Sequence, residues 1–133
     1  PVLTTIHSNS CEATFLRMVT LCKRMFDAAD KTLYELVTEA FPIIVYAKQL
    51  ENGERKIMEI MECEIKTDGE RVYRTIYRYN IRENYYDETG RLIIKGEHEF
   101  IGEISEGLKK RLVENGLPKS ELEKICRGEA AVC

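Results

Sequence analysis

The sequence lacks the features on which several common protein classes depend. No apolar run approaches the ~20 residues of a membrane-spanning helix, so we expect no membrane insertion. Only two histidines, His7 and His98, and no C-x-x-C pair among the five cysteines leave no ligand set for a structural zinc ion, and we predict no metal site. The odd cysteine count also fits a disulfide framework poorly, which favours a reducing, cytoplasmic location.

Catalytic signatures are equally scarce. No serine nucleophile elbow is present. Gly102 and Gly107 are spaced as in a phosphate-binding Walker A loop, but Leu108 stands where that loop requires its lysine. We therefore expect the chain by itself to hold no nucleotide. Its net charge of −3 also argues against a dedicated polyanion binder.

What is present indicates one folded domain: 133 residues, of which 44% are hydrophobic and 32% charged. Val2 to Ile6 has the pattern of a short strand. Ser10 fits an N-cap, and six apolar residues follow it at helical spacing: Cys11, Phe15, Met18, Cys22, Met25 and Phe26. A second helix is expected to follow Asp30 and to end at Pro42.

The middle of the chain predicts an antiparallel meander. Ile43 to Leu50, Arg55 to Lys66 and Arg71 to Arg82 are strand candidates, separated by Asn52-Gly53 and Asp68-Gly69, which favour tight hairpin turns. Two-residue turns would set four opposing pairs: Lys48–Ile57, Val45–Ile60, Ile60–Tyr77 and Met58–Tyr79. One face would then carry an apolar set: Ile43, Val45, Ala47, Met58, Ile60, Tyr77 and Tyr79.

The same register places Glu59 against Arg78, a cross-strand pair worth about 0.2–1 kcal/mol. The middle strand, Arg55 to Lys66, is expected to bulge near Ile60, where its alternation is least regular. A turn at Asp87 to Gly90 precedes a short strand to Lys95, and two closing helices are predicted, at residues 105–115 and 118–126. The expected fold is α+β, with helices flanking an antiparallel β-meander. Its parts are residues 1–27, 28–42, 43–96 and 97–133.

The strand from Arg71 to Arg82 interleaves arginines with tyrosines, as single-stranded RNA-binding surfaces do. Strand alternation would send Arg74 and Arg78 to one face, and Tyr73, Tyr77 and Tyr79 to the other. A stacking platform needs both on one face, so an aromatic core face with a charged outer face is favoured. The alternative function is a stand-alone interaction or RNA-binding module that uses Arg74, Arg78 and Arg82.

The segment Thr4-Thr5-Ile6-His7-Ser8-Asn9-Ser10 gathers hydroxyl, amide and imidazole groups at the start of a helix. Free backbone N–H groups and the helix dipole favour phosphate oxygens at such a place. The simpler interpretation is that Ser and Asn cap the helix and His7 is a surface residue. Arg17 is either solvated or directed along the same surface. A thiol enzyme that uses Cys11 and His7 is a third possibility, although Cys11 lies on the apolar stripe.

This segment, with the amphipathic helix that carries Arg17, resembles the histidine box of secretion and pilus-assembly ATPases, closest to the CpaF-like branch. That box typically reads T-T-x-H-A-N-S, and Ser8 replaces its alanine. The stretch from Arg55 to Glu62 resembles the family's R-x-I-x-E-I-x-E strand, and residues 104–122 resemble its closing helices with their L-x-x-N-G-x-P turn.

The resemblance implies that the chain is the C-terminal subdomain of a RecA-like α/β ATPase domain, in a hexameric cytoplasmic ATPase that powers pilus assembly or secretion. Val2 to Ile6 would then join that domain's parallel core sheet. His7 would be a catalytic residue near the γ-phosphate, while Thr5, Asn9 and Arg17 would contact the nucleotide. ATP and Mg²⁺ would be held mainly by residues upstream of Pro1, so the isolated fragment is expected to be inactive. The implied partners are inner-membrane secretion or pilus platform proteins, and no nucleic acid.

Overall fold

The computed structural model describes residues 3–127. It is an α+β fold of four helices and one four-stranded antiparallel sheet. The elements, in chain order, are α1 (Cys11–Met25), α2 (Asp30–Ala40), β1 (Ile43–Gln49), β2 (Arg55–Ile65), β3 (Arg71–Tyr86), β4 (Leu92–Phe100), α3 (Glu106–Glu114) and α4 (Lys119–Cys126). Within the described residues, no helix combines the length and apolar character needed to cross a bilayer.

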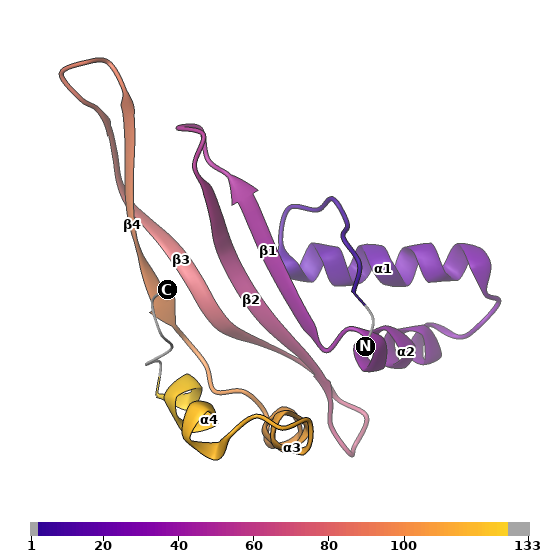
Figure 1. Cartoon of the computed structure of the whole chain (residues 1–133). Coiled ribbons are helices and arrows are strands. Elements are labelled where there is room, and N and C mark those ends of the chain that lie inside the picture. The colour runs from indigo at the N-terminus through magenta and orange to yellow at the C-terminus, as the bar shows by residue number, and fades with distance from the viewer. Residues whose placement is uncertain (1–2, 128–133) are drawn as a thin grey trace.

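The sheet has the strand order β1-β2-β3-β4, so each strand pairs with its neighbour in sequence. Figure 1 shows α1 and α2 together on one side of the sheet, while α3 and α4 lie near the lower ends of the strands. The main core forms between α1, α2 and the sheet, and its buried residues are Cys11, Phe15, Met18, Val19, Leu33, Val37, Ile44, Met61 and Cys63. The predicted apolar stripe of the first helix therefore does face the core, although Met25 and Phe26 at its end are exposed.

The hairpin turns are one residue longer than the two-residue turns predicted from the sequence. The backbone N–H of Leu50 donates to the carbonyl of Glu54, and the N–H of Lys66 donates to the carbonyl of Glu70. Each turn therefore has three residues, with its glycine (Gly53 or Gly69) at a positive φ of about 85°. The third turn closes in the same way between Asp87 and Arg91.

Each extra turn residue is offset by a β-bulge farther along the hairpin. The β1–β2 register shifts between Tyr46 and Ala47, and the β2–β3 register shifts between Ile60 and Met61. The predicted pairs beyond the shifts are therefore confirmed: Val45–Ile60, Ile60–Tyr77 and Glu59–Arg78. The pair Lys48–Ile57 lies before the shift and was wrong, since Lys48 faces Lys56 and Ile57 faces Ala47. The middle strand was expected to bulge near Ile60; its extra residue is Met58, two positions away, whereas the irregularity opposite Ile60 has its extra residue, Ile76, on β3.

The bulge opposite Ile60 also reverses the alternation along β3. Tyr73 contacts Phe15 of α1, with ring centroids 5.4 Å apart. Tyr77 instead packs edge-on against Phe100 of β4. The prediction that Tyr73 shares a face with Tyr77 and Tyr79 was therefore wrong, because it assumed an unbroken strand.

The apolar face predicted for the meander is not the face against which α1 and α2 pack. Those helices cover Ile44, Met61 and Cys63, whereas Val45, on the predicted face, is 53% exposed. β1 carries apolar residues on both of its faces, so the sequence pattern could not identify which face the helices cover.

The β3–β4 hairpin is longer than predicted. β3 continues past Arg82 to Tyr86, and β4 continues past Lys95 to Phe100. The hairpin rises well beyond the rest of the sheet (Figure 1), and residues 81–86 are all exposed. Its base is held by close packing, because a Cβ atom at Gly96 would lie only 2.6 Å from the Tyr79 ring. The outer part of this hairpin is rich in polar residues, so a prediction based on alternating apolar residues did not identify it as strand.

The strand predicted at Val2 to Ile6 does not form among the described residues. Residues 3–6 are in no strand, and Val2 lies outside the described residues. The two closing helices are confirmed close to their predicted positions, but neither α3 nor α4 contains a buried residue. Ser105, directly before α3, contacts Glu62 of β2.

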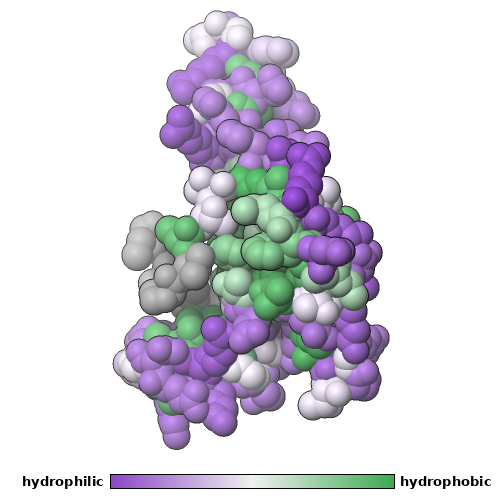
Figure 2. All heavy atoms as spheres, turned by 90° about the vertical axis from the view of Figure 1, so that its right-hand side faces the viewer, coloured by the Kyte–Doolittle hydropathy of each residue, from purple (hydrophilic) through white to green (hydrophobic). Residues whose placement is uncertain are grey.

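The face that carries α1 and α2 is partly apolar. Figure 2 views the molecule from this side and shows apolar side chains gathered in the middle of the face. The large exposed apolar residues of these two helices and their connection are Leu16, Leu21, Met25, Phe26 and Leu36. Exposed apolar groups that gather in this way are typical of a surface that contacts a partner.

Candidate functional site

The start of α1 is built as the sequence predicts. Ser10 has an extended backbone, and its Oγ accepts a hydrogen bond of 3.0 Å from the N–H of Ala13. The hydroxyl of Thr14 donates to the carbonyl of Ser10 at 2.7 Å. These bonds fix the turn that leads from His7 into the helix, so Ser10 is confirmed as the N-cap.

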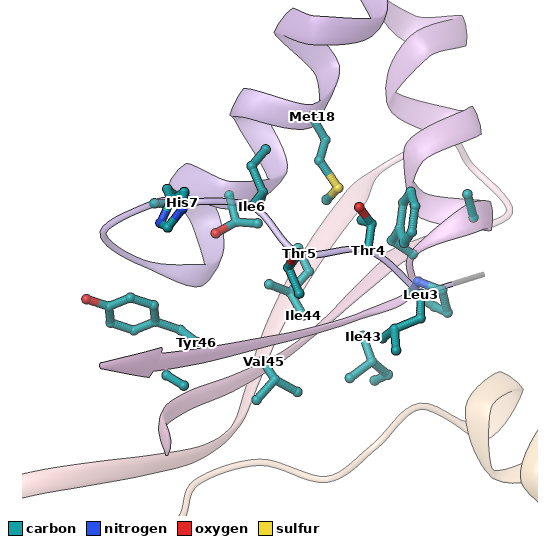
Figure 3. Close-up of a pocket in the computed structure, with 16 residues that line it drawn as sticks. Leu3, Thr4, Thr5, Ile6, His7, Met18, Ile43, Ile44, Val45 and Tyr46 are labelled. Atoms are coloured by element: carbon teal, nitrogen blue, oxygen red, sulfur yellow. The ribbon is translucent and has the colours of Figure 1, made fainter. Parts of the chain in front are cut away.

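The residues before this cap run beside β1 as irregular chain. Together with β1 and the end of α2 they line a groove of about 560 Å³. Figure 3 shows Leu3 to His7 passing over β1, with Met18 of α1 on the other side of the chain. Thr5 lines this groove, and His7 and Ser8 stand at the point where it meets the start of α1.

A second pocket brings together three of the four residues singled out by the histidine-box resemblance. His7, Asn9 and Arg17 line it, with Ser8 and Ala13, around a volume of about 480 Å³. Arg17 reaches it from the second turn of α1, so it is directed along the same surface rather than away from the box. Thr5 is not part of this pocket, although the groove that contains Thr5 shares His7 and Ser8 with it.

The charge of this pocket is positive. Arg17 forms no salt bridge within residues 3–127, and no carboxylate lines the pocket. A guanidinium, an imidazole and an amide are donors that suit phosphate oxygens, whereas Mg²⁺ prefers carboxylates and water. The pocket therefore fits an anion and not a metal ion. In the described part of the chain, His, Cys, Asp and Glu form no group of three that could hold a metal.

Fewer backbone N–H groups at the start of α1 are free to bind an anion than the sequence suggests. The N–H of Ala13 is bonded to Ser10, and the N–H of Cys11 donates to Glu59 Oε2 at 3.4 Å. An anion in this pocket would therefore be held mainly by side chains rather than by a set of free N–H groups. The sequence argument from open helix N–H groups was thus only partly right.

Glu59 is the residue of this region that the sequence did not reveal. Its predicted partner across the strands is confirmed, because Arg78 Nη2 lies 3.4 Å from Glu59 Oε1. Its contact with Cys11, 48 residues earlier in the chain, carries no signal in the sequence. Only the packing of α1 against β2 brings the two residues together.

Three of the four arginines of β3 are paired with glutamates on the neighbouring strands, and the fourth, Arg71, lies over the ring of Tyr34. Arg74 Nη2 lies 2.9 Å from Glu64 Oε2, Arg78 pairs with Glu59, and Arg82 pairs with Glu97. Their positive charges are partly neutralised, which weakens the case for phosphate binding along this strand. The geometry gives no support to the RNA-binding alternative.

Cys11 is a core residue. It is fully buried, and its Sγ donates to the carbonyl of Ile44 at 3.4 Å. Burial, with the Glu59 carboxylate nearby, raises the pKa of the Cys11 thiol to about 12. Burial beside Glu62 raises the pKa of Cys63 to about 12 as well. A thiolate nucleophile needs a lowered pKa, so the hypothesis of a Cys11–His7 thiol enzyme is contradicted.

These thiols give the first prediction. At pH 8, iodoacetamide is expected to modify the exposed Cys126 and to leave Cys11 and Cys63 unmodified until the protein is unfolded, as peptide mass spectrometry would show. In the unfolded chain the two thiols release protons near pH 9, and in the folded chain only near pH 12. The unfolded state therefore binds fewer protons above pH 9, and the free energy of unfolding falls as the pH rises through this range. Modification of native Cys11 as fast as Cys126 would contradict the burial.

In comparisons with known proteins, no protein-family model and no curated protein sequence matches the chain.

Proposed function

We propose that this chain is the C-terminal part of a hexameric ATPase of the secretion and pilus-assembly family, resembling its CpaF-like branch. Its role would be to present His7, Asn9 and Arg17 to the phosphates of a bound nucleotide. One observation carries the proposal: these three residues, chosen from the sequence alone, line a single open and positively charged pocket. The RecA-like setting of this subdomain and the role of Thr5 belong to the same proposal.

The chemistry of the pocket defines what the chain can contribute. Phosphoryl transfer depends on positioning and on stabilising the charge that develops on phosphate oxygens. Arg17 supplies a fixed positive charge, and His7 and Asn9 supply hydrogen-bond donors. The phosphate loop, the Mg²⁺ ligands and the residue that activates water would come from the rest of the parent protein, because the pocket contains no carboxylate.

The partly apolar face over α1 and α2 supports a parent in which this chain contacts other subunits or domains. Its exposed residues include Met25, at 79% exposure, and Phe26, at 59%. In the proposed ATPase this surface would be covered within the hexamer or by platform proteins of the inner membrane, on its cytoplasmic side.

The second prediction tests the pocket directly. The chain has only two histidines, so the imidazole signals of His7 and His98 can be followed separately by NMR. Titration with pyrophosphate is expected to shift the His7 signal and to leave that of His98, on β4, unchanged. The Arg17→Ala chain is expected to bind about tenfold more weakly, because a charge-assisted hydrogen bond is lost.

Arg24→Ala is the matched control, since it removes the same charge from the same helix but lies outside the pocket. Equal weakening by both variants would indicate general electrostatics and would contradict a specific site. In the full-length parent, His7→Ala is expected to lower ATP turnover by about 10²-fold, with His98→Ala near the wild-type rate. Robust ATP hydrolysis by the 133-residue chain alone would overturn the proposal.

A further inference from the structure

The carboxylate of Glu59 joins three elements at the start of α1. Its Oε2 accepts from the N–H of Cys11, at 3.4 Å. Its Oε1 accepts from the hydroxyl of Thr75 at 3.3 Å and from Arg78 Nη2 at 3.4 Å. The side chain is only 18% exposed, so these contacts replace most of its water.

Cys11 is the first residue of α1 and directly follows the N-cap Ser10. It is held a second time by β2, because its Sγ lies 3.6 Å from the carbonyl oxygen of Glu59. The residues of the phosphate pocket stand on either side of this point, with Asn9 just before it and Arg17 less than two turns after it. The position of Cys11 therefore sets the position of the pocket.

The groups around Glu59 stabilise its carboxylate beside the first turn of α1. A carboxylate beside the first turn of a helix is stabilised by the helix dipole. Arg78, on β3, balances its charge from the other side. Thr75, also on β3, fixes the second carboxylate oxygen. The contact therefore links the start of α1 to both β2 and β3.

We propose that Glu59 is the positioning residue of the pocket formed by His7, Asn9 and Arg17: it fixes the first turn of α1 against the sheet so that these side chains converge on a phosphate group. This inference rests on the proposed function of the pocket. Glu59 does not touch the phosphate in this account and acts only through α1.

The test compares three substitutions in the 133-residue chain. Glu59→Ala removes the acceptor for the N–H of Cys11, while Glu59→Gln removes the charge but keeps an acceptor oxygen. Glu64→Ala is the matched control, because Glu64 lies on the same strand and pairs with an arginine of β3, Arg74. Binding of pyrophosphate is measured from the His7 signal, at a temperature at which each variant is fully folded. Hydrogen exchange of the Cys11 amide is measured in parallel.

Glu59→Ala is expected to weaken pyrophosphate binding by about tenfold or more, since small misplacements of binding groups have effects of this size. It is also expected to speed exchange of the Cys11 amide. Glu59→Gln should bind as tightly as the wild type or more tightly, and Glu64→Ala should change neither measurement. A variant that merely lowered stability would leave the dissociation constant of the folded protein unchanged.

Equal pyrophosphate binding by Glu59→Ala and the wild type would overturn the positioning role and leave the proposed function standing. No shift of the wild-type His7 signal would overturn the proposed function, and the positioning role with it. Unchanged exchange of the Cys11 amide in Glu59→Ala would overturn the positioning role alone. If Glu59→Ala does not fold, Glu59→Asp takes its place, because it keeps the charge but shortens the reach toward Cys11.

Discussion

Phe15→Ala is expected to lower the free energy of unfolding by about 3–5 kcal/mol, the range for deleting a buried aromatic ring. Phe15 is fully buried. Its ring stacks on Tyr34 of α2, with centroids 5.7 Å apart, and meets Tyr73 of β3 edge-on. One side chain thus joins both helices of the main core to the sheet, and its loss would leave a cavity at their junction.

The effect is large relative to the total, because single domains have only about 5–15 kcal/mol of stability. Urea unfolding followed by circular dichroism would measure it. Leu16→Ala provides the control, since Leu16 is the next residue of the same helix but is 44% exposed, and should cost less than about 1 kcal/mol. Similar losses in the two variants would show that α1 does not pack as described.

Glu62→Ala is expected to release the C-terminal helices from the sheet. Glu62 is only 3% exposed, and it accepts from the backbone N–H of Ser105 at 2.8 Å and from the Ser105 hydroxyl at 2.5 Å. Ser105 is in turn the N-cap of α3, accepting from the N–H of Leu108. Since α3 and α4 contain no buried residue, this contact carries much of their attachment.

Removal of the acceptor leaves the Ser105 N–H without its partner, at a cost of about 1–3 kcal/mol. Hydrogen exchange should therefore speed up throughout α3 and α4 while the amides of α1 and α2 keep their protection. Glu64→Ala, two residues along β2 on a partly exposed side chain, should leave both regions unchanged. Unchanged protection in α3 and α4 of the Glu62→Ala chain would show that other contacts hold them.

The register of the sheet shows where sequence reasoning succeeds. The pairs Val45–Ile60 and Ile60–Tyr77 were correct even though the turn lengths were wrong. Each turn took one residue more than its Asn-Gly or Asp-Gly dipeptide indicates, and each hairpin absorbed the difference in one bulge. The predicted pairs far from the turn form because the extra residue of the turn and the extra residue of the bulge lie on opposite sides of the register and cancel.

The N-terminal segment shows the opposite case. Leu3 to Ile6 contains the β-branched residues typical of strands, but within residues 3–127 it forms no strand. Strand propensity only becomes structure when a partner supplies hydrogen bonds and a packed face. The family resemblance would place that partner in another part of the parent protein.

The residues of the candidate pocket could be grouped from the sequence alone where they lie close together along the chain. His7, Asn9 and Arg17 lie within eleven positions of one another, so one cap and one helix are enough to bring them together. Thr5 lies in the adjoining groove instead. Glu59 is separated from Cys11 by 48 positions, and only the tertiary contact of α1 with β2 could reveal it.

The sequential strand order has a consequence for how the chain folds. Each strand pairs with the next through a three-residue turn, so the sheet can assemble hairpin by hairpin with little loop entropy to overcome. Contacts such as Phe15–Tyr73 and Cys11–Glu59 instead join residues that are distant along the chain, and they form only once strands are present to receive α1. The pocket lined by His7, Asn9 and Arg17 lies at the start of α1, so we expect its geometry to form at a late, non-local stage of folding, after the meander is in place.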